Sequence, residues 1–196
     1  MKAAVVTMEC QRGVIGDLAT FPALASAVAG SAMLERLVAL VHAARQHGVT
    51  VVHATVEFRP DRAGSPQNAP LLKMAARIPD QLLVGSDAAQ LVAGLGPESS
   101  DLVSCRHHGV SPFTGTSLDA LLRAERVDTV VACGASLNVG VLGLCIEAVN
   151  LGYEVVVAVD ATVAVPPSYA EQVLSNTFHQ VATLSTVDEV ISSWSR

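Results

Sequence analysis

The sequence predicts an α/β fold, a doubly wound and mostly parallel sheet with helices on both faces. Short apolar runs rich in Val alternate along the chain with longer segments whose apolar residues recur at helical spacing. This alternation is typical of strand–helix–strand units. Aromatic residues make up only 4% of the 196 residues, whereas hydrophobic residues make up 51%. The core must therefore consist of Val, Leu, Ala and Ile, which suit a parallel sheet buried on both sides.

The strand-like runs are short, apolar and rich in β-branched residues. They are residues 3–8, 50–55, 101–105, 129–133, 154–160 and 183–186. The run at 129–133 is the most strand-like, and Gly134 is expected to end it.

The helical segments lie between these runs and carry recognisable end signals. They are residues 31–47, 69–77, 116–126, 138–151, 167–180 and 187–194, with a shorter helix within 20–30. Gly48 and Gly152 are expected to follow helix ends as C-caps. Thr116 or Ser117 is a natural N-cap, and Asp119 suits the first turn. No internal repeat or boundary is visible, so residues 1–196 are expected to form one domain.

Composition excludes several classes of partner. A formal net charge of −6 argues against nucleic-acid binding, which needs clustered Lys and Arg. No apolar run reaches the roughly 18–20 residues of a membrane-spanning helix. The start of the chain does not end in a signal-peptide cleavage site, so we expect a cytoplasmic protein acting on a small molecule. The high apolar content suggests a homodimer or a higher homo-oligomer.

Four cysteines are present, and no two have C-x-x-C spacing. A zinc knuckle or a redox pair is therefore not indicated, and free thiols are expected in the cytoplasm. Cys133 ends a buried strand and Cys145 lies inside a helix, so both are expected to be core residues. Ser136 is better placed as a nucleophile, but the sequence shows no base beside it and no G-x-S-x-G motif.

Ligands of doubly wound sheets lie at the carboxyl ends of the strands. Four segments meet this rule: residues 9–12, 53–59, 105–113 and 134–141. In the first, a partly buried Glu9 could exchange protons, although a surface ion pair is an equal alternative. In the third, Arg106 and His107 could bind an anion or move a proton, although a solvated loop is the simpler interpretation.

The fourth segment combines Gly134 and Gly140 with the start of a helix. Free amides at a helix N-terminus can bind an anion or an oxyanion. The spacing is not G-x-G-x-x-G, so no dinucleotide cofactor is predicted. The alternative is a tight turn with a glycine chosen for packing.

Taken in order, these segments resemble the isochorismatase-like hydrolase superfamily over nearly the whole chain. The matching features are Glu9-Cys10-Gln11 after the first strand, the segment 107–119 with Phe113 and Gly115-Thr116, the segment 134–141, and Gly152-Tyr153 before the next strand. The resemblance implies the fold predicted above.

The resemblance also shows an altered site. The cysteine hydrolases of the superfamily use an Asp–Lys–Cys triad, and the matching positions here hold Glu9, His107 and Gly140. Members with Gly at the third position cleave a vinyl ether by protonation, without a covalent intermediate. By this resemblance Glu9 is the general acid, and His107 stands in place of the lysine. Arg106 could instead supply the lost positive charge.

The resemblance implies further contacts with a small polar or anionic substrate. The substrate-binding candidates are Gln11, Arg59, Arg106, Phe113, Ser136, Asn138 and Gly140. The loop containing His53, Glu57 and Arg59 is expected to line the pocket. It does not match the metal-binding pattern of nicotinamidases, so neither a metal nor another cofactor is predicted.

Three functions follow from these observations. The first is an isochorismatase-like hydrolase that works by acid–base chemistry at Glu9. The second is a catalytically silent member that binds a small molecule. The third is an amidase whose nucleophile has moved to Ser136 or Cys133.

Overall fold

The computed structural model describes residues 2–195. Six strands form one sheet in the order β3-β2-β1-β4-β5-β6, and every neighbouring pair is parallel. The strands are β1 (Ala3–Met8), β2 (Thr50–Val56), β3 (Leu102–Arg106), β4 (Thr129–Ala135), β5 (Glu154–Val163) and β6 (Thr183–Ser185). The predicted fold class is confirmed. The strand order reverses between β1 and β4, which is where doubly wound sheets bind ligands.

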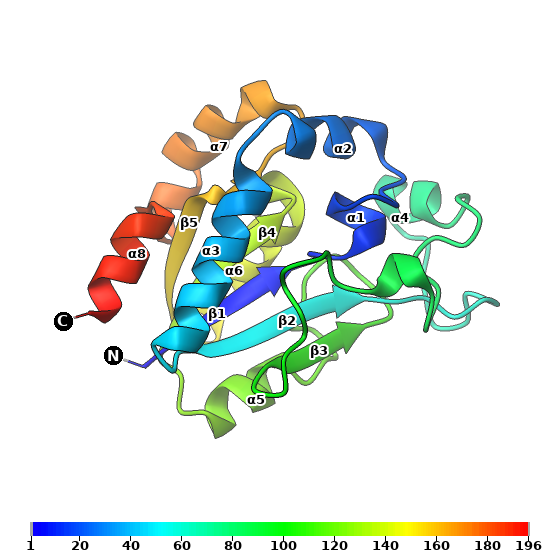
Figure 1. Ribbon diagram of the computed structural model, residues 1–196. Helices are drawn as coiled ribbons and strands as arrows, with labels where there is room; N and C mark the ends of the chain where they lie inside the picture. Colours follow the sequence, from blue (N-terminus) through cyan, green and yellow to red (C-terminus); the bar gives the residue numbers. More distant parts are fainter. Residues whose placement is uncertain (1, 196) are drawn as a thin grey trace.

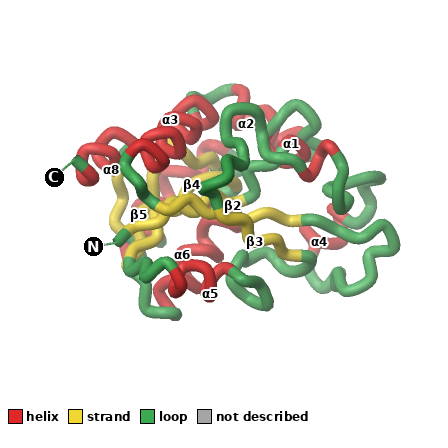
Figure 2. The backbone as a smooth tube through the Cα atoms, turned by 60° about the horizontal axis from the view of Figure 1, so that its bottom comes forward, coloured by secondary structure: helices red, strands yellow, loops and turns green. Residues whose placement is uncertain are grey.

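Helices cover both faces of the sheet (Figures 1 and 2). On one face lie α1 (Arg12–Ile15), α2 (Pro22–Ala29), α3 (Met33–Gln46) and α8 (Val187–Trp194). On the other lie α5 (Leu118–Ala124), α6 (Leu142–Asn150) and α7 (Ala170–Asn176). Each layer buries its own hydrophobic cluster against the sheet. A short helix, α4 (Pro70–Ala75), has no buried residue and lies beyond the carboxyl ends of β2 and β3.

Some predicted boundaries are wrong for identifiable reasons. Strand β4 does not end at Gly134 but continues to Ala135. Gly134 has a φ of +104°, and a Cβ there would lie 2.3 Å from the Met8 carbonyl oxygen, so only glycine lets the strand pass this point. The predicted helix 167–180 is not continuous. Only Ala170–Asn176 is α-helical, and a short 3₁₀ turn lies on either side of it.

The segment after β4 begins with a π-helical turn, η2 (Leu137–Val141), before α6 starts at Leu142. Such turns are rare inside helices and are frequent at functional sites. Here the turn places residues 136–140 beside the end of β1.

No single helix among the described residues is long and apolar enough to span a membrane, although α2 and α3 together pass that test as a bent pair. The apolar residues of α3 are buried in the core, where they contact β2 and β5. Within residues 2–195, all four cysteines are free thiols, and Cys133 and Cys145 are buried in the core as predicted.

A buried polar network ties β1, β2 and the start of β3 together. His53 bonds Thr7 through Nδ1 at 2.8 Å and Asp101 through Nε2 at 3.2 Å. Asp101, only 1% exposed, also pairs with Arg45 at 2.6 Å. Burial lowers the pKa of His53, and the hydrogen bond that its ring donates to Asp101 only partly opposes this. The His53 side chain is therefore part of the sheet interior and does not line a pocket, contrary to the expectation from sequence.

Candidate functional site

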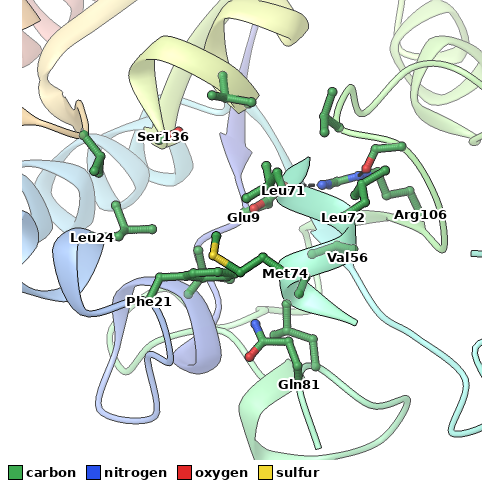
Figure 3. Close-up of a pocket in the computed structure, with 18 of the residues that line it drawn as sticks. Glu9, Phe21, Leu24, Val56, Leu71, Leu72, Met74, Gln81, Arg106 and Ser136 are labelled. Carbon is green, nitrogen blue, oxygen red and sulfur yellow. Dashed lines mark hydrogen bonds and ion pairs between the residues drawn. The ribbon is translucent and has the colours of Figure 1, made fainter. Parts of the chain in front are cut away.

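A cavity of about 270 Å³ lies at the carboxyl ends of the strands, at the point where the strand order reverses. Its floor comes from the ends of β1, β2 and β3 and from the turn after β4. Glu9, Val56, Arg106 and Ser136 contribute from these four places. Its walls are helices α2 and α4, as Figure 3 shows. Its volume is near the lower end of the range for small-molecule sites.

Glu9 forms the acidic centre of this cavity. It follows β1 directly and has a φ of +51°, a conformation that is uncommon outside glycine and tends to occur at functional sites. Its backbone amide donates to the carbonyl of Ala54 at 2.9 Å, which fixes the turn against β2. Among the described residues, Glu9 carries the one carboxyl group that lines the cavity.

Arg106, rather than His107, accompanies Glu9. Arg106 is the last residue of β3 and is 96% buried. Its Nη2 donates to Glu9 Oε1, and its Nε donates to the Gly109 carbonyl at 3.3 Å. The two side chains form an ion pair, and charge-assisted hydrogen bonds of this kind are stronger than those between neutral groups.

The expected role of His107 in the cavity is not what the structure shows. Successive side chains of an extended chain point to opposite sides, so the residue after Arg106 faces away. His107 is exposed, and its Nδ1 contacts the Glu57 carbonyl at 2.9 Å. The positive charge at this position of the site comes from Arg106 instead.

Three of the predicted substrate contacts also lie elsewhere. Gln11 is fully buried and bonds the backbone of Val56 in both directions at 2.9 Å, so its amide joins β2 to the turn after β1. Arg59 is exposed and pairs with Asp61. Phe113 is buried and stacks on Tyr153, with ring centroids 6.1 Å apart.

The segment after β4 does line the cavity through Ser136, Asn138 and Gly140. Asn138 is engaged, because its amide donates to and accepts from the backbone of Val165 at 3.1 Å. This pair of bonds holds the end of β5 against η2. For the Ser136 hydroxyl, no hydrogen bond is formed within residues 2–195.

No sequence pattern pointed to the remaining lining residues, most of which are apolar. They come from loops and from the short helices α2 and α4, where no period identifies a binding face. Phe21, Leu24, Leu71, Leu72, Met74 and Gln81 are examples.

No thiol lines the cavity in the part of the chain that the structure describes. Burial raises the pKa of Cys145 to about 12 and raises that of Cys133 well above its usual value. A buried thiol with a raised pKa is a poor nucleophile. Within the same residues, no three His, Cys, Asp or Glu side chains are placed to hold a metal ion.

Gly140 is enclosed by its neighbours. A Cβ built at this position would lie 3.0 Å from the Ala135 carbonyl oxygen and 3.1 Å from Met8 Cε. Both contacts are tighter than ordinary packing. A cysteine at this position would therefore need Met8 and the backbone of the turn to move.

We expect Gly140→Ala to lower the free energy of unfolding by about 1–3 kcal/mol, the usual cost of overpacking. Gly143, three residues along, is the matched control, because a Cβ there would meet only Ser111 at 3.5 Å. Gly143→Ala should stabilise the helix by up to about 1 kcal/mol. Urea unfolding followed by circular dichroism measures both, and equal effects would contradict the crowding at Gly140.

Comparison with known proteins gives consistent matches. The Isochorismatase domain family matches residues 3–189. Ureidoacrylate amidohydrolase RutB of Methylorubrum extorquens is 32% identical over 192 residues, which cover 90% of this chain and 75% of that protein. The uncharacterized isochorismatase family protein YecD of Escherichia coli O157:H7 is 32% identical over 102 residues, and maleamate amidohydrolase of Pseudomonas putida is 28% identical over 130. These two matches span 53% and 57% of the relatives' lengths, and 52% and 64% of this chain.

Solved structures show the same architecture. An isochorismatase family protein from Desulfovibrio vulgaris has a TM-score of 0.83 and 25% identity, with 100% of this chain and 99% of that chain covered. N-carbamoylsarcosine amidase from Thermoplasma acidophilum has a TM-score of 0.73 at 24% identity, covering 96% of this chain and 98% of that chain. The second match supports the fold alone.

Proposed function

Because the chain belongs to the isochorismatase family, we propose that it is a hydrolase of that family that uses Glu9 for acid–base chemistry without a cysteine nucleophile. The observation that carries this proposal is the composition of the cavity. It holds one carboxyl group paired with one guanidinium and, within residues 2–195, no thiol. The triad positions inferred from the resemblance are Glu9, His107 and Gly140, and in the cavity Arg106 is the cationic residue beside Glu9.

The ion pair with Arg106 holds the Glu9 carboxyl group at the floor of the cavity. The resemblance implies a general acid, whereas in hydrolysis by water Glu9 acts first as the base and then as the acid. Glu9 takes a proton from water as the water oxygen bonds to the substrate carbonyl carbon. It then returns that proton to the leaving group as the bond between the carbonyl carbon and that group breaks.

A substrate with an amide or ester group is consistent with these steps. Two of the relatives are named as amidohydrolases, for ureidoacrylate and for maleamate. Hydrolysis of such a carbonyl compound consumes one water molecule and needs no cofactor. Arg106 orients the Glu9 carboxyl group, and proton exchange by a positioned side chain contributes about 10²–10⁴-fold to a rate.

Glu9→Gln tests this function, because the amide has nearly the same shape but cannot exchange the proton. Hydrolysis of a panel of aliphatic and aromatic amides and esters is followed by mass spectrometry. We expect the variant to lose about 100-fold or more of the rate on whichever compound turns over. Glu154→Gln, at the exposed start of β5, should retain full activity.

Treatment with iodoacetamide should leave the wild-type rate unchanged. An unchanged rate in Glu9→Gln would rule the proposal out. A covalent acyl adduct on Ser136 would show that the protein is a serine amidase instead. Ligand binding without any turnover would favour a catalytically silent binding protein.

A further inference from the structure

The cavity is polar at its floor and apolar along its walls. Helix α4 contributes Leu71, Leu72 and Met74, and the segment that includes α2 contributes Phe21 and Leu24 from the opposite side, as Figure 3 shows. Leu71 and Met74 are 38% and 48% exposed, so α4 keeps apolar side chains at a solvent-facing site. A ligand that covers these side chains would remove their apolar surface from water, which is favourable.

Most polar groups of the cavity are already engaged. Both ends of the Asn138 amide bond the backbone of Val165. The Gln81 side-chain oxygen accepts a hydrogen bond from Thr20, and Glu9 and Arg106 bond each other. In the described part of the chain, the Ser136 hydroxyl, the Gln81 amide nitrogen and Arg106 Nη1 remain for a ligand. Ser136 and Arg106 suffice to orient one carbonyl group at the floor, but the apolar walls offer few partners to the rest of a substrate with many polar atoms.

The charges at the floor also cancel. Glu9 and Arg106 form a pair, and the other polar side chains of the cavity, Gln81, Ser136 and Asn138, are neutral. An anionic ligand could reach Arg106 Nη1, which has no hydrogen-bond partner among the described residues, but it would lie beside the Glu9 carboxylate and be repelled by it. A neutral carbonyl group avoids that repulsion.

We infer that the substrate is a neutral amide or ester whose carbonyl group lies at Glu9 and Ser136 and whose apolar tail, aliphatic or aromatic, lies between α2 and α4. This inference rests on the proposed function for the position of the carbonyl group. It differs from the small polar or anionic substrate expected from sequence, because the walls offer the rest of such a molecule no partners.

Binding of a series of primary amides tests the tail. Dissociation constants of acetamide, butanamide and hexanamide are measured by ligand-detected NMR on the full chain, together with hexanoate. We expect affinity to rise roughly fourfold for each added methylene group that becomes buried, and hexanamide to bind more tightly than hexanoate. Met74→Gln should weaken hexanamide binding on the order of three- to tenfold and leave acetamide binding unchanged.

Ile146→Gln is the matched control. Ile146 is an apolar residue on α6 with 42% exposure, similar to Met74, but it lies outside the cavity lining. Equal effects of the two substitutions, an affinity that does not depend on chain length, or tighter binding of hexanoate would overturn the inference. Because binding requires no turnover, Glu9→Gln should retain the chain-length dependence, so failure of the proposed chemistry and failure of this inference are distinguishable.

Discussion

Asp101→Ala is expected to lower the free energy of unfolding by about 3–5 kcal/mol, the cost of breaking a buried ion pair. Asp101 is 1% exposed and accepts from Arg45, from His53 and from the Glu98 amide. Its removal leaves the Arg45 guanidinium, itself only 10% exposed, without its buried partner. Urea unfolding at pH 7.5 measures the loss.

The choice of pH 7.5 for that measurement follows from the pKa of His53. Its pKa is lowered in the folded protein because burial disfavours the charged ring. Its contribution to stability is therefore complete above the unfolded value of about 6.5 and is lost as the pH falls through the folded pKa. At pH 7.5 the ring is neutral in both states, so the experiment reports on Asp101.

Asp188→Ala provides the comparison, because Asp188 pairs with Arg36 while 78% exposed. Exposed pairs contribute little, so this variant should unfold close to the wild type. A similar small effect of Asp101→Ala would show that the buried network does not hold the start of β3 in place.

Arg106→Met is expected to lower the free energy of unfolding by about 3 kcal/mol, because it leaves the Glu9 carboxylate without its partner. The value is at the lower end of the range for buried pairs, since the Glu9 side chain remains 20% exposed. The proposed hydrolytic activity should fall with it, because Glu9 loses the group that orients its carboxyl group.

The double variant Arg106→Met with Glu9→Gln separates charge from packing. Without the carboxylate no charge is left unpaired, so this protein should recover more than half of the stability lost in the single variant. Its activity should not return. No recovery would indicate that Arg106 acts through packing and its bond to Gly109, and not through Glu9. Arg59→Met, which removes an exposed pair with Asp61, is the control.

Local pattern was sufficient for most of the fold. The bounds of β1 and α8 were predicted as observed, and all six strands lie where short apolar runs predicted them. Pattern failed where the backbone is irregular. The register shift near Gly134 accompanies the longer β4, and the segment 167–180 is divided into a 3₁₀ turn, α7 and a second 3₁₀ turn.

The candidate site was only partly predictable. Glu9 could be identified because polar residues at strand ends meet at one edge of a parallel sheet. Gln11 has the same position in sequence, yet it satisfies buried backbone groups instead of a ligand. The sequence does not indicate which polar residue at a strand end bonds buried backbone groups and which one faces the cavity.

The architecture, the family resemblance and the glycine at position 140 could be read from the sequence alone, because residue type and strand–helix alternation are local properties. That Arg106 and not His107 accompanies Glu9 follows from the strand packing, because one residue more of β3 reverses the direction of the side chain. The tertiary structure also revealed Met8 packed against Gly140 and the apolar walls of α2 and α4. These are contacts between segments far apart in the chain, and they depend on how the layers pack.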